Sequence, residues 1–238
     1  MEVAPTAHYS MGGVVVEAET HATAVSGLYA AGECTSGVHG ANRLGGNSLA
    51  EILVFGKIAG EMAAEFSSEL HIQKRSRAVI KLANQELDDL TSNGEQLARP
   101  LQRAVRDLMW KYCGVLRSGE GLEEGLRQLM EIKEAAKDVD VRPSAEGFTD
   151  LALALDLLGS IDSAEATLRC AIERRESRGS HQRSDFTELS KDHDVNYVIN
   201  LESGNQVVSK HQVEPLPADL EQAMNDYQEL NVDGRLLE

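Results

Sequence analysis

Aromatic residues are scarce in this chain of 238 residues: they make up 4% of the sequence and include a single tryptophan. Hydrophobic residues still reach 42%, so a core has to be built mostly from leucine, alanine, valine and isoleucine. No run approaches the roughly 18 consecutive apolar residues of a membrane-spanning helix. The length allows one large domain or two small ones.

Cysteine is also sparse, because Cys34, Cys113 and Cys170 lie far apart and form no C-x-x-C pair. Scattered cysteines in odd number favour free thiols in a reducing compartment and argue against an iron–sulfur or zinc cluster built by this chain alone. Positive charge is in the minority, since 39 acidic and 23 basic residues give a formal charge of -16. This balance argues against a nucleic-acid partner and against docking on anionic lipid.

The most informative segment is residues 40–49, Gly-Ala-Asn-Arg-Leu-Gly-Gly-Asn-Ser-Leu, which leads into a long apolar helical pattern. It combines a glycine-bearing turn, the guanidinium of Arg43 and a helix start at Asn47 or Ser48. Free N–H groups at a helix N-terminus beside an arginine form a site for an anion. A second such segment, His8-Tyr9-Ser10-Met11-Gly12-Gly13, lies near the beginning of the sequence.

The periodicity of apolar residues predicts a mixed fold of the α+β class. Short strands are expected at 14–16 and 27–32, the second one buried on both faces, followed by a buried helix from Ser48. Leucine spacing then predicts core-facing helices in an antiparallel bundle, over 76–91, 95–113, 120–137, 146–159 and 161–178. A hairpin is expected to join 195–201 to 206–209 across residues 202–205, and a short helix to follow near 218–230.

Taken together, the motifs resemble the flavoprotein subunit of succinate dehydrogenase and fumarate reductase, and the related L-aspartate oxidase. The matching segments are 8–13, 27–33, 39–49 and 175–186, the last reading Arg-Glu-Ser-Arg-Gly-Ser-His-Gln-Arg-Ser-Asp-Phe. The resemblance covers most of this chain but only the C-terminal part of a family member. It implies the C-terminal remnant of an FAD-binding α/β domain at 1–66, a helical bundle at 67–180 and a small α/β region with the hairpin at 181–238.

The resemblance also implies an enzyme that interconverts succinate and fumarate by hydride transfer to or from FAD. His8 and Arg43 would bind the dicarboxylate, because a guanidinium holds a carboxylate with two hydrogen bonds and an imidazole adds a directional one. The cofactor-binding residues would be Glu33, Asn47, Ser48 and Leu49, with the helix N-terminus stabilising negative charge on the reduced flavin. No metal site is expected, and no residue of this chain is expected to relay the proton, a role that an upstream arginine has in the family.

Plain structural roles compete with some of these assignments. Asn47 or Ser48 is expected to cap the helix even without a cofactor. His39 is expected to pack near the site as support. In the segment 175–186, an ion-pair network is expected to join Arg178, His181 and Arg183 to Glu176 and Asp185.

Several parts of the family's machinery have no counterpart in these residues, among them the G-x-G-x-x-G fingerprint and the flavin-linking histidine. We therefore expect the chain to be the C-terminal portion of a longer polypeptide and to be inactive alone. The resemblance implies an iron–sulfur partner subunit, membrane-anchor subunits reached through it, and a cytoplasmic location at the inner face of the plasma membrane. Two alternatives stay open. One is a fragment of L-aspartate oxidase, which Gly45-Gly46 disfavours, and the other is a non-catalytic helical module that docks an iron–sulfur partner.

Overall fold

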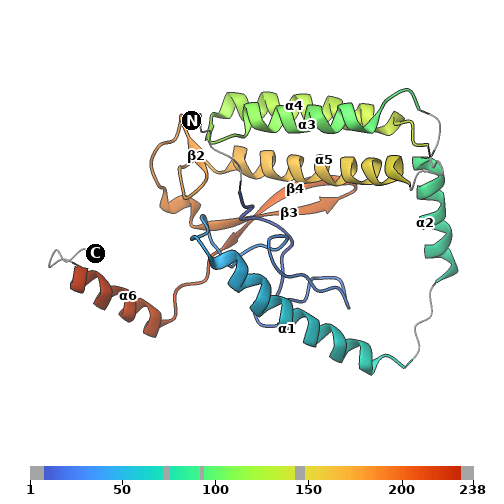
Figure 1. Ribbon diagram of the computed structural model, residues 1–238. Helices are drawn as coiled ribbons and strands as arrows, with labels where there is room; N and C mark the ends of the chain where they lie inside the picture. The colour runs from blue at the N-terminus through green and yellow to red at the C-terminus, as the bar shows by residue number, and fades with distance from the viewer. Residues whose placement is uncertain (1–7, 72–75, 92–93, 143–147, 232–238) are drawn as a thin grey trace, which may run out of the picture. The chain divides into compact units, whose positions relative to one another are not determined.

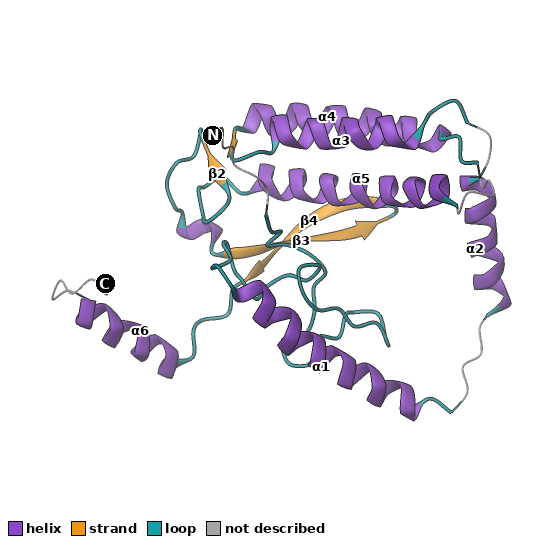
Figure 2. Ribbon diagram, viewed as in Figure 1, coloured by secondary structure: helices purple, strands orange, loops and turns teal. Residues whose placement is uncertain are grey.

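The computed structural model of the chain describes residues 8–71, 76–91, 94–142 and 148–231. It divides into two compact units, Met1–Leu189 and Ser190–Glu238. Helices and small sheets both occur, as the α+β class requires (Figure 2). The first unit contains α1 (Asn47–Glu69), α2 (Arg77–Leu90), α3 (Ala98–Tyr112), β1 (Leu116–Arg117), α4 (Gly119–Ala135), η1 (Ala136–Asp138), α5 (Thr149–Glu173) and β2 (Gln182–Arg183). The second contains η2 (Lys191–His193), β3 (Val195–Glu202), β4 (Asn205–Gln212) and α6 (Ala218–Asn231).

Helices α3, α4 and α5 lie side by side and hold the core of the first unit (Figure 1). Tyr112 at the end of α3 fills the space beside Gly125 near the start of α4, so these two helices run in opposite directions. Ser118 begins α4 by accepting a hydrogen bond from the N–H of Gly121, a normal N-cap. The core is largely aliphatic, and its most deeply buried members are Leu122, Leu129, Val141, Ala154, Leu157, Ile161 and Leu168.

The leucine pattern predicted helix positions better than it predicted burial. Helix α2 forms where a helix was expected, yet it has no buried residue, and Val79 and Leu82 are 65% and 60% exposed. The prediction that the leucines of 76–91 lie in the core is therefore wrong for Leu82 and Leu87, which are exposed, whereas Leu90 is partly buried against the core. A helix position follows from local spacing, but burial needs a packing partner, and among the described residues the core provides one only for Leu90 at the end of this helix.

Helix α5 is continuous through Gly159 and Ser160, so the break expected there is wrong. An isolated glycine costs a helix only about 1 kcal/mol. Leu157, Ile161 and Leu168 on both sides of it are buried in the shared core and outweigh that cost. The helix ends at Glu173 rather than Arg178, and the helix start expected at 144–147 lies outside the described residues.

Residues 8–46 form turns and bends, so the two strands expected here are wrong. Only isolated bridges occur, between Val14 and Thr35 and between Ala22 and Tyr29. Gly27 and Gly32 adopt positive φ angles of 81° and 86°, which bend the chain where an extended strand was expected. Leu28 is 52% exposed instead of being buried on both faces, because no neighbouring strand covers it among the described residues.

Helix α1 begins close to the expected residue, but most of its surface is exposed. Only Glu51 and Ala59 are buried, while Leu49 and Leu53 are 67% and 73% exposed. The helix contacts the front segment through Phe55, whose ring stacks on His21 at 4.4 Å, and through Phe66. The prediction of a fully buried helix is therefore wrong for the described part of the chain.

The second unit consists of an antiparallel hairpin and a helix, as predicted. Strands β3 and β4 pair from Val195 with Gln212 to Glu202 with Asn205, and the turn lies at Ser203-Gly204. Gly204 has a φ of 81°, a conformation suited to glycine in a tight hairpin turn. None of the helices in the described ranges is long and apolar enough to cross a membrane.

Candidate functional site

The start of α1 is open because no side chain caps it. Gly46 is the N-cap residue and has a left-handed φ of 86°. Neither Asn47 nor Ser48 caps the helix, so that expectation is wrong, and the reason is that the turn brings glycine to the cap position. Leu44 and Leu49 on either side are 71% and 67% exposed. A helix N-terminus with its N–H groups accessible and apolar side chains beside it can receive a flat, anionic group.

Arg43 lies directly before this helix and is held over the ring of Tyr9, with Cζ 4.7 Å from the ring centroid. Its Nη1 donates a hydrogen bond to the carbonyl of Leu44 at 3.0 Å. Its Nε is buried and has no hydrogen-bond partner among the described residues. A buried donor without an acceptor costs roughly 1–3 kcal/mol. The guanidinium is therefore placed for an acceptor from outside the described chain.

Behind Arg43 lies a network centred on Glu51, which is only 4% exposed. The hydroxyl of Tyr9 donates to Oε2 of Glu51, and Nε2 of His39 lies 2.9 Å from the same oxygen. Burial opposes ionisation of Glu51, but the hydrogen bonds from Tyr9 and His39 outweigh it and lower the pKa of the carboxyl. Burial and the Glu51 carboxylate raise the pKa of Tyr9 to about 12. The phenol thus stays protonated and fixed beneath the guanidinium.

The structure brings most of the predicted site residues around this network. The N–H of Ser10 donates to Oε1 of Glu33 at 2.8 Å, and the ring of the neighbouring Tyr9 contacts Arg43. The segment after His8 therefore contacts both Glu33 and Arg43. His8 itself is exposed. His39 supports the site through Glu51, the kind of role expected for it. Tyr9 and Glu51 were missed, although one carboxylate within the apolar run of α1 was a usable signal.

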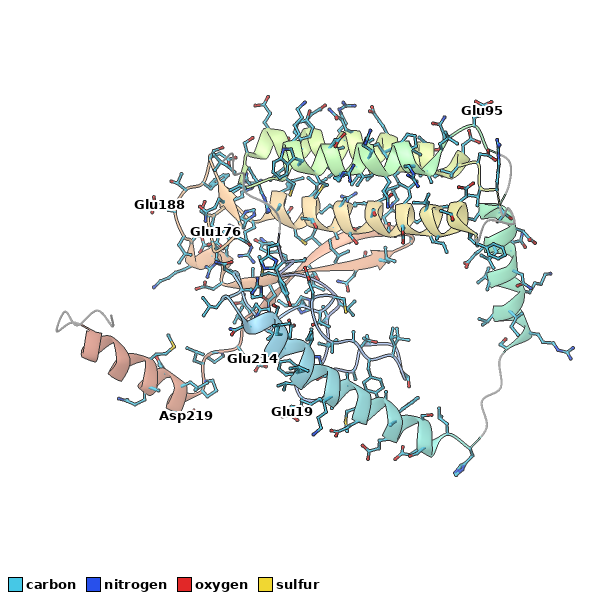
Figure 3. All side chains as sticks on the ribbon, viewed as in Figure 1. Glu19, Glu95, Glu176, Glu188, Glu214 and Asp219 are labelled. Carbon is cyan, nitrogen blue, oxygen red and sulfur yellow. The ribbon has the colours of Figure 1, made fainter. Side chains whose placement is uncertain are left out.

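A second polar cluster follows α5 and is built on Glu176, which is fully buried (labelled in Figure 3). Its carboxylate accepts hydrogen bonds from Arg174 at 2.5 Å and Arg178 at 2.7 Å. Arg183, 2% exposed, makes a two-pronged contact with Asp185, with both distances 2.8 Å. The hydrogen bonds from Arg183 hold the pKa of Asp185 well below its usual range. The expected ion-pair network is confirmed for Arg178 and Arg183.

His181 has a different role from the one predicted, because it contacts a cation instead of a carboxylate. Nη1 of Arg117 lies 2.9 Å from its Nδ1, and its Nε2 lies 3.0 Å from the carbonyl of Arg174. Since a guanidinium can only donate, Nδ1 accepts and Nε2 carries the proton. Burial lowers the pKa of His181 to about 4, and the neighbouring arginines add to this.

Neutral His181 makes stability depend on pH. The folded pKa of about 4 lies below the ordinary value of 6.5, so the unfolded chain binds more protons between these values. The stabilisation is complete above about pH 6.5 and is lost as the pH falls towards 4, amounting to about 2 kcal/mol for a partly exposed ring. We expect His181→Gln to flatten this dependence in urea unfolding followed by tryptophan fluorescence. His71→Gln, at an exposed histidine, should leave the dependence unchanged, and equal slopes in all three proteins would contradict the assignment.

The second cluster contacts the loop that carries Arg43. The N–H and the hydroxyl of Ser180 both donate to the carbonyl of Ala41, at 3.0 and 3.2 Å. Gly179 has a φ of 57°, and a Cβ there would lie 2.2 Å from the same carbonyl oxygen. Only glycine allows this approach. The network around Glu176 therefore supports the turn before α1 from behind.

Comparisons with known proteins agree with this arrangement. Residues 1–49 match the model of an FAD binding domain, and residues 102–231 match that of the fumarate reductase flavoprotein C-terminal region. The fumarate reductase flavoprotein subunit of Escherichia coli is 39% identical over 210 residues, which cover 82% of this chain and 33% of the relative. The succinate dehydrogenase flavoprotein subunit of Rickettsia conorii is 32% identical over 221 residues, covering 87% and 37%.

Solved structures show the same relationship. Mycobacterium smegmatis Sdh1, in complex with UQ1, superimposes with a TM-score of 0.87 at 33% identity, covering 97% of this chain and 40% of that one. A quinol-fumarate reductase with menaquinol gives 0.76 at 33% identity, covering 89% and 38%. Adenylylsulfate reductase from Archaeoglobus fulgidus, at 19% identity and a TM-score of 0.64, shares the fold alone.

The matched models place the chain among flavoproteins with an FAD binding domain. Within that class it belongs to the fumarate reductase and succinate dehydrogenase flavoprotein family, whose C-terminal model covers more than half of it. The chain spans about a third of the length of the curated relatives that it matches.

Proposed function

We propose that residues 1–238 form the C-terminal part of a flavoprotein that interconverts succinate and fumarate. The observation that carries this proposal is Arg43, whose buried Nε lacks an acceptor among the described residues and which lies beside an uncapped helix start. A dicarboxylate would supply that acceptor. The family match supports the choice of substrate.

The residues around the start of α1 fit one edge of FAD. Gly46 places no side chain at the cap, and the exposed Leu44 and Leu49 offer apolar surface to a planar ring. Asn47, Ser48 and Leu49 would hold the cofactor there, and Glu33 would hydrogen-bond its ribitol or ribose. When bound, FAD accepts or gives a hydride. The partial positive charge of the helix N-terminus would stabilise negative charge on the reduced cofactor by up to about 2 kcal/mol.

The substrate would be bound and oriented by His8 and Arg43. The guanidinium fits one carboxylate through two parallel hydrogen bonds, and the exposed imidazole of His8 can turn to meet the ligand. Tyr9 and Glu51 fix the arginine before the ligand arrives, which removes part of the cost of ordering it. These residues bind and orient, and none of them is assigned the transfer of a proton.

The remaining assignments are part of the same proposal. Residues 1–66 would complete an FAD-binding domain, 67–180 would form the helical bundle and 181–238 the C-terminal α/β region. Electrons would pass to an iron–sulfur partner protein and from there to membrane-anchor subunits, on the cytoplasmic side of the plasma membrane. The relatives solved with UQ1 and with menaquinol support exchange with a quinone.

A chimera tests the proposal. It joins the part of the Escherichia coli flavoprotein subunit that precedes its match to residues 1–238, and is expressed with the iron–sulfur subunit of that relative. We expect bound FAD and fumarate-dependent oxidation of a reduced viologen dye. A folded chimera that binds FAD but oxidises aspartate would assign the chain to L-aspartate oxidase instead. The 238-residue chain alone is expected to bind no stoichiometric FAD, and turnover by it would contradict the expectation that it is inactive alone.

A further inference from the structure

A groove of about 1010 Å³ is lined by residues of α3 and α5, two of the helices that hold the core. Its floor is apolar and includes the buried Val105 and Ala164 and the partly buried Met109 and Leu153. The lining residues on α3 extend from Arg99 to Met109. At a rise of about 1.5 Å per residue, this length corresponds to roughly 15 Å, or nearly three helical turns. The groove is therefore elongated and has the length of a short helix.

Arginines on α3 give the groove its charge. Arg99, Arg103 and Arg106 all line it, and their spacing of four and three residues places them on one face of the helix. None of the three forms an ion pair with a carboxylate of the described residues. Arginines on the two neighbouring helices are paired, since Arg127 on α4 pairs with Glu124 and Glu131, and Arg169 on α5 pairs with Glu165.

The opposite wall of the groove leaves this charge uncompensated. On α5 it presents Ser160, Ser163 and Thr167, and no acidic residue lines the groove in the described part of the chain. Ser160 donates its hydroxyl proton to the carbonyl of Asp156, and Thr167 donates to that of Ser163. A chain with a formal charge of -16 thus carries a local groove of positive charge above an apolar floor. Such a surface attracts a negatively charged partner and disfavours the binding of a basic one.

We propose that this groove binds an acidic amphipathic helix of a partner protein. Carboxylates at positions i, i+4 and i+7 of that helix would match the three arginines, and leucines between them would reach the apolar floor. The elongated shape favours a helix over a compact anion. The overall negative charge of the chain disfavours a nucleic acid. This surface is separate from Arg43 and α1, so the inference does not depend on the proposed reaction.

The natural reporter is Trp110, the only tryptophan in the sequence. It is 63% exposed and follows Arg106 by one helical turn on α3. The probe is a synthetic helical peptide of roughly 18 residues, long enough to form a helix, with glutamates at i, i+4 and i+7 beside leucines. A matched peptide carries glutamine at the three positions. Titration into the full 238-residue chain is followed by Trp110 fluorescence.

We expect the glutamate peptide to bind, the glutamine peptide to bind about tenfold more weakly, and the binding to weaken as salt rises. The double variant Arg103→Gln/Arg106→Gln should also weaken binding about tenfold. The matched control Arg77→Gln/Lys81→Gln removes the same charge from exposed positions on α2 and should leave the Kd unchanged. Circular dichroism checks that both variants keep the helix content of the parent.

Three results would overturn the inference. The first is equal affinity for the glutamate and glutamine peptides. The second is complete competition by pyrophosphate at equal concentration, which would make the groove a site for a small anion. The third is a dimer, seen by light scattering, that is lost in Arg103→Gln/Arg106→Gln and not in the control, because the groove would then bind a second copy of the chain.

Discussion

In the chimera, Arg43→Gln is expected to lower kcat/KM for fumarate and for succinate by about 100- to 1,000-fold. Glutamine cannot make the charge-assisted, two-pronged contact with a carboxylate, whose loss costs about 3–4 kcal/mol. Arg43→Lys keeps the charge but not the planar fork, so an intermediate value is expected. FAD should remain bound in both variants, as measured by its visible absorbance, because the cofactor is assigned to Glu33 and the start of α1.

The matched control is Arg77→Gln, which removes an exposed arginine from α2 and should leave kcat/KM unchanged. Steady-state assays at several substrate concentrations separate binding from turnover. An unchanged kcat/KM in Arg43→Gln would contradict the assignment of this arginine to the substrate. Loss of FAD from a folded Arg43→Gln variant would instead assign Arg43 to cofactor binding.

The other large effect is expected on stability, from Glu176→Gln. Glu176 is fully buried and forms ion pairs with Arg174 and Arg178, and the substitution removes the negative charge from both pairs. Removing one partner of a buried ion pair costs about 3–5 kcal/mol, and the lower value applies here because both arginines keep some contact with water. Urea unfolding followed by Trp110 fluorescence, which reports on α3, should show the free energy of unfolding falling by about 3 kcal/mol.

Glu123→Gln provides the comparison for this measurement. Glu123 is exposed on α4, so its replacement should change the free energy of unfolding by less than about 0.5 kcal/mol. Equal effects of the two substitutions would show that the buried carboxylate is not a stabilising centre. If Glu176→Gln lowers the free energy of unfolding, it should also weaken substrate binding in the chimera, since the loop after Glu176 supports the turn that carries Arg43.

Elements with a local signal could be predicted from the sequence. The hairpin needed only alternating residues around Ser203-Gly204, and α4 needed only a leucine stripe after Ser118. The front segment had no such signal. Its shape depends on contacts such as Ser10 with Glu33 and Ala41 with Ser180, which join residues far apart in the sequence. Glycine bends replaced the strands that its apolar residues suggested.

The sequence also predicted only the part of the candidate site that depends on neighbouring residues. Arg43 and the helix start are neighbours in the sequence, so the motif alone placed them together. Tyr9 and Glu51 are 42 residues apart, and only the folded chain shows that they share a hydrogen bond. The roles proposed for His8, Glu33, Asn47, Ser48 and Leu49 stay predictions until the chimera is assayed.

The hydrogen bonds from Ser180 to Ala41 join residues separated by 139 positions. During synthesis, the turn before α1 leaves the ribosome long before its support exists. The core helices α3, α4 and α5 contact one another across shorter sequence separations, whereas the turn must wait for the last part of the first unit. Ligand binding is therefore expected to be acquired late in translation, because a chain that ends before residue 180 lacks the hydrogen bonds that fix the turn before α1.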